Sequence, residues 1–200
     1  MFKLEKEKMN VYDFDGTIYK GDSGADFIKF MCAKKPFFMT GHILKSLKYV
    51  AKYEIKKIEF KEMKEYLFSF VKSIDNLEKY TSEFAEKYKD NIKENYKVTR
   101  KNDDVVVSAS LDFYLVPLCK SIGIENVICT NYDTKNGKII GENCKGEEKV
   151  TRINLAYGEK MKIECAYGDT KGDVPMMKRA EKGYVIKGEK IIEYNDEYKF

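Results

Sequence analysis

A single long helical interruption in an otherwise alternating chain is the feature that most constrains the fold. Short apolar segments typical of buried strands occur at 9–13, 105–107, 127–129, 163–167 and 184–186. From the second segment onward, helical patterns lie between them. Alternation of strands and helices predicts a parallel sheet with helices on both faces. We therefore predict a doubly wound, Rossmann-like α/β core.

The interruption lies between the first and second of these strands. Residues 22–97 alternate helical patterns with Lys/Glu-rich faces and contain no strand signal. One pattern places Ile43, Leu44, Leu47, Val50 and Ala51 on one face of a helix. Two more use Phe60, Met63, Leu67, Phe70 and Val71, and then Leu77, Tyr80, Phe84, Tyr88 and Ile92. We predict an all-helical cap over residues 20–97, inserted into a core of residues 1–19 and 98–200.

The second half of the chain has a regular order of elements. Helices are predicted near 111–121, 147–157 and 174–182, each leading to the next strand. Residues 132–141 contain Asn136-Gly137, a strong signal for a β-hairpin.

Composition excludes several protein classes. The formal net charge of +4 is too small to imply nucleic-acid binding. The five cysteines are odd in number and lack CxxC spacing, which argues against a disulfide framework and a zinc site. The N-terminus has no apolar run of a signal peptide, and no stretch is long enough to cross a bilayer. We expect a cytoplasmic protein.

The positive charge is concentrated in the predicted cap. Residues 20–97 hold 17 lysines, no arginine and 12 acidic residues. A solvated helical surface is the favoured interpretation, and a lid that attracts an anionic substrate is the alternative. Residues 34–39 lead into a helix bearing Lys45, Lys48 and Lys52 beside an apolar face, which could contact an anionic membrane weakly. Packing of this helix inside the cap is the favoured reading.

Polar side chains follow the predicted strands where each strand ends. They are Asp13 and Asp15, Ser108 and Ser110, and Asp169 and Asp173, with Lys149 at the start of a helix. The carboxyl ends of parallel strands are where ligands bind, so we expect these groups to converge. Several carboxylates in one pocket need a counter-charge, and a Mg²⁺ ion supplies it, bound by carboxylates, waters and the phosphate oxygens of the substrate.

Such a set suits phosphoryl transfer. A carboxylate can attack phosphorus to give an aspartyl-phosphate that water later opens. A Lys and a metal ion neutralise the negative charge of the incoming phosphate, while a Ser hydroxyl holds a phosphoryl oxygen. A second acid two residues away can protonate the leaving oxygen and then help to deprotonate water.

These motifs resemble the haloacid dehalogenase superfamily of phosphatases. The resemblance rests on Asp13-Phe-Asp-Gly-Thr17, Val105-Val-Val-Ser-Ala-Ser110, Lys149 and Gly168-Asp-Thr-Lys-Gly-Asp173, in the family's order along nearly the whole chain. The helical insert after the first motif looks like subfamily IB, which contains phosphoserine phosphatase, with its C1-type cap.

The resemblance implies a role for each residue. Asp13 would be the nucleophile and Asp15 the general acid/base. Ser108 and Lys149 would contact the phosphoryl group, with Thr17 and Asp22 also on the substrate side. The metal would be Mg²⁺, held by Asp13, Asp169 and Asp173 and by the backbone carbonyl of Asp15.

Some residues have structural alternatives. Ser110 is expected to cap the following helix rather than bind phosphate. Asp22 could contact substrate, or the region could simply start a helix, since Ser23 and Asp26 form a capping-box pattern. The lone His42 is expected to be structural.

The substrate is less constrained than the chemistry. The insert contains no arginine to clamp the carboxylate of phosphoserine, and Gly172 stands where phosphoserine phosphatases usually have Asn. We favour hydrolysis of an unspecified small phosphorylated metabolite. Phosphoserine phosphatase, lipid-phosphate phosphatase and phosphotransferase activities stay open, as does a phospho-accepting signalling domain. The sequence does not give the oligomeric state.

Overall fold

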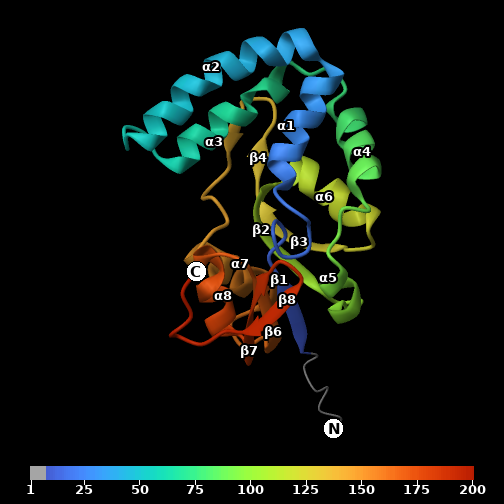
Figure 1. Cartoon of the computed structure of the whole chain (residues 1–200), viewed down its shortest axis with the longest axis vertical. Coiled ribbons are helices and arrows are strands. Elements are labelled where there is room, and N and C mark those ends of the chain that lie inside the picture. Colours follow the sequence, from blue (N-terminus) through green and yellow to red (C-terminus); the bar gives the residue numbers. More distant parts are fainter. Residues whose placement is uncertain (1–7) are drawn as a thin grey trace.

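The computed structural model describes residues 8–200, and a six-stranded sheet forms its centre (Figure 1). The first seven residues, on which part of the prediction of no signal peptide rests, lie outside this range. The strands are β1 (Met9–Tyr12), β2 (Val105–Leu111), β3 (Asn126–Thr130), β6 (Ile163–Gly168), β7 (Lys182–Lys187) and β8 (Lys190–Glu193). Their order across the sheet is β3-β2-β1-β6-β7-β8.

The sheet is parallel except at one edge. β1 pairs in parallel with both β2 and β6, so it occupies the middle of the sheet. β8 runs antiparallel to β7 after a turn at Gly188, whose φ of +62° favours glycine. The predicted doubly wound core is confirmed, and the antiparallel edge strand β8 is a further feature of the sheet that the sequence pattern does not predict.

Helices cover both faces of the sheet because its strands are apolar on both sides. In β2, Val105 and Val107 pack in an apolar cluster with Ile153 and Met176. These partners come from α7 (Glu147–Tyr157) and α8 (Val174–Arg179). Val106 points to the other face and joins a larger cluster that includes α6 (Asp112–Ser121). The period of two along a buried strand explains this division.

The predicted insert is helical, as expected. It contains α1 (Ser23–Lys34), α2 (Pro36–Glu54), α3 (Phe60–Phe68), a 3₁₀ turn (Ser69–Ser73), α4 (Leu77–Tyr88) and α5 (Glu94–Thr99). Phe27 of α1 stacks on Tyr114 of α6 with ring centroids 5.3 Å apart, so one apolar cluster continues from the insert into the core. The cap boundaries at residues 20 and 97 stay a prediction.

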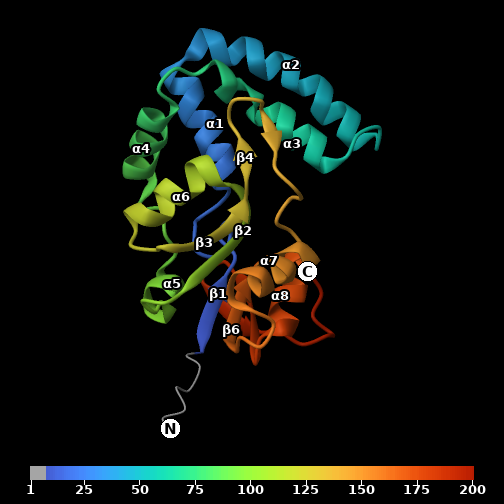
Figure 2. The same ribbon diagram turned by 180° about the vertical axis from the view of Figure 1, so that it is seen from behind.

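The α2 helix packs through a different face from the one predicted. Leu44, Leu47 and Ala51 of the predicted apolar face are exposed. The helix instead contacts α3 through His42, whose Nε2 lies 3.0 Å from the Leu67 carbonyl oxygen, and through Tyr49. Figures 1 and 2 show α2 and α3 side by side at the end of the molecule opposite β7. His42 therefore has the structural surroundings expected of it.

The predicted hairpin fixes α3 over the sheet. It consists of β4 (Tyr132–Asp133) and β5 (Lys138–Ile139) around Asn136-Gly137. The Glu65 carboxylate of α3 accepts hydrogen bonds from the Ile139 backbone N–H at 3.0 Å and from the Lys138 ammonium at 2.8 Å. These bonds hold the cap helix in place beside the carboxyl ends of the strands.

The remaining findings concern thiols and helices. All five cysteines are free. Among residues 8–200, no helix combines the length and the apolar character that crossing a bilayer requires.

Candidate active site

A cavity of about 400 Å³ lies between the carboxyl ends of the strands and the cap helices. Most of the predicted site residues line it, and α1 and α3 form its roof. The predicted residues at this cavity are Asp13, Asp15, Asp22, Ser108, Lys149, Asp169 and Asp173. The structure thus brings these groups together at one cavity, as the sequence predicts.

A buried lysine joins two carboxylates at the floor of the cavity. The Lys149 ammonium donates hydrogen bonds to Asp13 Oδ1 and to Asp173 Oδ1, each at 2.6 Å. Its side chain is almost completely buried, at the start of α7. Burial would lower the pKa of Lys149, but the two carboxylates together raise it above its ordinary value, so the amine is a cation.

Asp13 directly follows the central strand β1, which is paired on both sides, and the Asp13 backbone N–H donates a hydrogen bond to the Tyr167 carbonyl oxygen at 2.8 Å. Burial raises the pKa of the Asp13 carboxyl, and the charge of Lys149 opposes that rise. The neighbouring carboxylate of Asp173 adds to the rise. A further cation beside Asp13 would favour the ionised form, which is the form that can attack phosphorus.

Asp173 is oriented by the turn that precedes α8. Its Oδ2 accepts hydrogen bonds from the backbone N–H and the hydroxyl of Thr170, at 3.0 and 2.8 Å. The two residues form a reciprocal capping box. This turn leaves Asp173 Oδ1 pointing to Lys149. The local sequence Asp-Thr-Lys-Gly-Asp therefore orients the second carboxylate that pairs with the buried lysine.

Asp15 is held by two serines. Its Oδ2 accepts a hydrogen bond from Ser110 Oγ at 2.5 Å, and its Oδ1 accepts one from the Ser23 backbone N–H at 2.6 Å. Burial raises the pKa of Asp15, and these hydrogen bonds oppose the rise. The prediction that Ser110 caps the following helix is wrong, because β2 extends to Leu111 and the Ser110 hydroxyl is committed to Asp15.

Ser108 lies one pleat earlier on the same strand. It is fully buried at the cavity floor, and its Oγ accepts a hydrogen bond from the Ser110 backbone N–H at 3.0 Å. This bond uses an acceptor site and leaves the hydroxyl proton available to a ligand oxygen.

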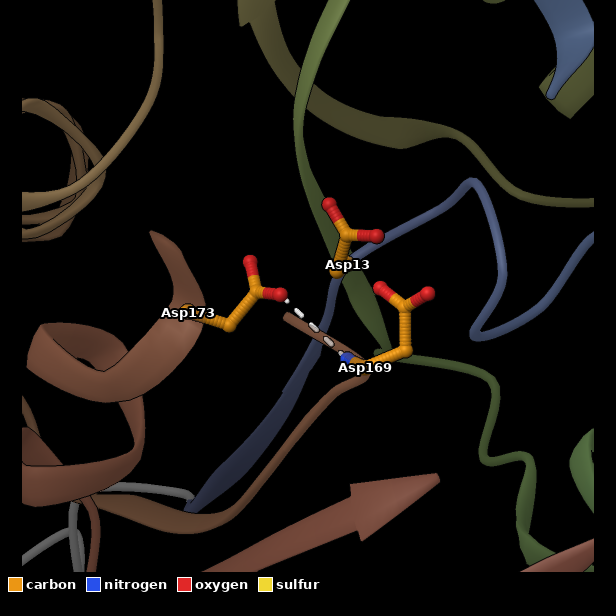
Figure 3. A group of neighbouring side chains, drawn as sticks. All are labelled: Asp13, Asp169 and Asp173. Atoms are coloured by element: carbon orange, nitrogen blue, oxygen red, sulfur yellow. Dashed lines mark hydrogen bonds between the residues drawn. The ribbon is translucent and has the colours of Figure 1, made fainter. Parts of the chain in front are cut away.

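Three carboxylates are arranged to hold a metal ion. One oxygen each from Asp13, Asp169 and Asp173 lies within 4.8 Å of the others. Figure 3 shows these three side chains next to one another. Asp169 Oδ1 is buried and has no hydrogen-bond partner in the described part of the chain. Burial, followed by repulsion from Asp173, raises the pKa of Asp169 to about 6. A buried acceptor without a partner beside two more acids fits an oxygen-liganded divalent cation.

The two other residues predicted on the substrate side, Thr17 and Asp22, have different surroundings in the structure. Thr17 is buried in the loop after β1 and is not among the residues that line the cavity. Its role as a substrate contact stays a prediction. Asp22 is the N-cap of α1 and accepts a hydrogen bond from the Ala25 backbone N–H at 2.8 Å, while it also lines the cavity. Both interpretations of Asp22 stay compatible with its position, but Asp22 rather than Ser23 caps the helix.

Lys64 is a cavity residue that sequence reasoning missed. It comes from α3, and its ammonium donates to the Ala109 carbonyl oxygen and to Asn143 Oδ1, at 2.5 and 2.9 Å. Burial lowers its pKa to about 8, while Asp15 and Asp22 oppose the change. An ammonium has three donors, so one stays available to the cavity. No local signal separates Lys64 from the other lysines of the insert.

The approach of Gly16 to Asp169 gives a test of the metal site. A Cβ added at Gly16 would lie 1.9 Å from Asp169 Oδ2, so Gly16→Ala must displace that carboxylate. We expect the Mg²⁺ affinity to fall about 10–100-fold, measured by calorimetric titration. Gly21→Ala is the matched control, because Gly21 also has a positive φ but a Cβ there meets no atom within 4 Å. Equal Mg²⁺ affinity in the two variants would contradict the assignment of Asp169.

Comparison with known proteins places these features in a family. The model of haloacid dehalogenase-like hydrolases matches residues 11–178. Protein CicA of Caulobacter vibrioides (strain NA1000 / CB15N) is 28% identical in an alignment of 189 residues that covers 88% of this chain and 84% of that protein.

Solved structures share the fold at low sequence identity. A protein with unknown function from Bordetella pertussis Tohama I matches with a TM-score of 0.72 and 18% identity, over 88% of each chain. A phosphoserine phosphohydrolase-like protein from Francisella tularensis subsp. tularensis SCHU S4 matches with a TM-score of 0.53 and 17% identity, over 88% of this chain and 86% of that one. The family match, which spans most of the chain including Asp13 and Asp173, shows that this protein belongs to the haloacid dehalogenase-like hydrolases.

Proposed function

We propose that the protein is a Mg²⁺-dependent phosphomonoester hydrolase that carries the phosphoryl group on Asp13. One observation carries this proposal: the Asp13 carboxylate lies at the floor of a cavity, paired with the buried Lys149 and beside the carboxylates of Asp169 and Asp173. A nucleophile surrounded by fixed positive charge and metal-binding acids suits attack on an anionic phosphate ester.

Asp13, Asp169 and Asp173 would hold the metal, and the unpaired buried oxygen of Asp169 supports this fit. When bound, Mg²⁺ supplies charge neutralisation and Lewis acidity at the phosphoryl oxygens. The Lys149 ammonium is already in contact with Asp13, and its positive charge favours the approach of the anionic phosphate to that carboxylate.

In the first step an oxygen of Asp13 attacks phosphorus and the bond between phosphorus and the ester oxygen breaks. Asp13 Oδ1 faces Lys149, so Oδ2 is the oxygen that is free to attack. Asp15, whose pKa is raised by burial, donates a proton to the leaving alcohol. The Ser108 hydroxyl would donate a hydrogen bond to a phosphoryl oxygen from the cavity floor.

In the second step the ionised Asp15 accepts a proton from water. The water oxygen attacks phosphorus, the bond between Asp13 and phosphorus breaks, and inorganic phosphate leaves with Asp13 regenerated. The two hydrogen bonds from Ser110 and Ser23 keep the same Asp15 carboxyl in place for both proton transfers. A domain that only stores a phosphoryl group has no use for such a fixed second acid, which favours hydrolysis over a signalling role.

The cap side of the cavity supports a leaving group with an apolar part. Its side chains from the insert are mainly apolar: Ile28, Phe60, Met63, Leu67 and Phe68. The insert has no arginine, and Arg152 of the core is engaged with Glu148 and with backbone carbonyl groups. A charged amino-acid leaving group would meet the charges of Asp22, Lys64 and Lys145 and would otherwise face an apolar wall.

A series of alkyl phosphates tests this specificity. We expect kcat/KM to rise about fourfold for each added methylene until the cavity is filled, since each buried methylene contributes about 0.8 kcal/mol. Propyl phosphate and phosphoserine form a matched pair, because they differ only in the amino and carboxylate groups. We expect propyl phosphate to be the better substrate by at least about tenfold. Preference for phosphoserine would overturn the apolar-substrate assignment but not the hydrolase itself.

The activity itself is tested by release of inorganic phosphate from an aryl phosphate. Turnover should require Mg²⁺, stop on addition of EDTA and return when Mg²⁺ is restored in excess. Turnover that continues unchanged in EDTA would contradict the metal dependence. Absence of turnover with aryl phosphates and the whole alkyl series would contradict the proposed hydrolase.

A further inference from the structure

The outer face of α2 exposes an apolar stripe that nothing in the described part of the chain covers. Phe37, Leu44, Leu47 and the following Ile55 have 96%, 65%, 57% and 61% of their surface exposed. At 3.6 residues per turn these four positions fall within an arc of about 80°. Single exposed apolar residues are common, but four large ones aligned along one helix mark an interaction surface.

The opposite side of the same helix explains why the stripe faces outward. Tyr49 stacks on Tyr66 of α3 with ring centroids 3.5 Å apart, and His42 lies against the Leu67 carbonyl. α2 is thus anchored to α3 through its inner face. The helix lies at the periphery of the molecule in both views (Figures 1 and 2).

The charge along α2 is mainly positive, and Glu54, its last residue, is the one acid of this helix. Residues 27–53 contain six lysines and no Asp or Glu. On the helix, Lys45, Lys48 and Lys52 lie within about 80° of Phe37, on the side away from Leu47. Lys45 and Lys48 are exposed, and their long aliphatic stems can follow an apolar surface while the ammonium groups reach anionic groups.

This combination favours a lipid surface over a second copy of the chain. A symmetric dimer formed through the stripe would bring together three lysines and one acid, Glu54, from the α2 of each copy, so most of these lysines would lack an acidic partner. An anionic bilayer instead offers phosphates to the lysines and an apolar boundary to the stripe. We propose that the outer face of α2 docks on anionic membrane, with the Phe37–Ile55 stripe entering the headgroup region.

Docking through α2 leaves the catalytic cavity free. The cavity roof is formed by α1 and α3, and no residue of α2 lines it. Membrane binding and hydrolysis of a soluble ester are therefore separable properties. The proposal does not depend on the proposed function, because vesicle binding is measured without turnover.

The experiment is flotation of the full chain with vesicles. Wild type should bind vesicles of phosphatidylcholine containing about one third phosphatidylglycerol and not vesicles of phosphatidylcholine alone, and binding should weaken with salt. Replacing Lys45, Lys48 and Lys52 by Gln should lower the partition coefficient about 100-fold, since each lysine near the surface contributes about 1 kcal/mol.

The apolar stripe has its own variant and control. The triple variant Phe37→Ser, Leu44→Ser, Leu47→Ser should lose binding, while its hydrolysis of a soluble substrate and its thermal unfolding stay unchanged. Leu155→Ser is the matched control, because Leu155 is 81% exposed on α7, and it should bind as wild type does.

Three outcomes would overturn the proposal. One is failure of wild type to bind anionic vesicles at low salt. Another is binding that the stripe variant does not reduce. The third is a concentration-dependent dimer in sedimentation that the stripe variant abolishes, which would assign the stripe to a second copy.

Discussion

Asp13→Asn is expected to lower the rate of phosphate release about 10⁴-fold or more, the scale expected when the nucleophile of a covalent mechanism is removed. The amide has the size of the carboxylate but cannot attack phosphorus. The fold should persist, because Lys149 keeps its ion pair with Asp173 at 2.6 Å. The measurement is steady-state phosphate release at saturating Mg²⁺, with circular dichroism to confirm the fold.

Asp22→Asn is the matched control for this substitution. Asp22 also presents a carboxylate to the cavity, and Asn is as good an N-cap as Asp, so α1 should be unaffected. We expect its rate to stay within about tenfold of wild type, an effect of at most about 1.4 kcal/mol. A similar collapse of activity in both variants, or near-normal turnover by Asp13→Asn, would contradict the role of Asp13.

Lys149→Met should be the most destabilising substitution in the site, besides abolishing most activity. It leaves Asp13 and Asp173 buried together without their cation, and breaking a buried ion pair costs about 3–5 kcal/mol. The folded-state pKa of Lys149 is raised above its ordinary value. Its contribution to stability is therefore fully present at neutral pH and is lost only as pH rises through that alkaline pKa.

Urea unfolding in EDTA measures this cost. Lys145→Met is the control, since Lys145 lines the same cavity but is exposed, and it should change stability by no more than about 0.5 kcal/mol. Adding Asp173→Asn to Lys149→Met should remove part of the loss, because one uncompensated charge disappears. If Lys149→Met lowered the free energy of unfolding by less than about 1 kcal/mol, the amine would not be the counter-charge of Asp13 and Asp173.

The sequence carried enough information for the core because its signals there are local. A β-branched run such as Val105–Val107 identifies a buried strand, and a parallel sheet then brings the residues after each strand to one edge. Asp13, Ser108 and Asp169 could be placed together for this reason. Lys149 could be assigned only through its order among the motifs, since it is one of many lysines.

Other features depend on contacts between distant residues. The hydroxyl of Ser110 was expected at a helix cap, but it binds Asp15, which lies 95 positions earlier in the chain. Lys64 reaches Ala109 and Asn143 from the insert. Propensity and periodicity describe near neighbours, so neither contact could be predicted from them.

The α2 helix shows a different limit. Its apolar residues at helical spacing correctly indicated a helix, but periodicity does not identify what covers an apolar face. Leu44 and Leu47 were assigned to the packed side, whereas ring stacking of Tyr49 and the hydrogen bond of His42 place the opposite side against α3. The antiparallel strand β8 was missed because it is only four residues long and its two isoleucines are adjacent, which gives no alternating pattern.

Trapping the phosphorylated protein tests the central claim most directly. The protein would be mixed with Mg²⁺ and an excess of substrate, quenched in acid during turnover, and analysed by intact-mass and peptide mass spectrometry. The account predicts a mass increase of one phosphoryl group, located on Asp13 within its peptide and absent from Asp13→Asn. Phosphorylation of another residue in place of Asp13, or turnover with no trapped phosphoryl group at any quench time, would contradict it.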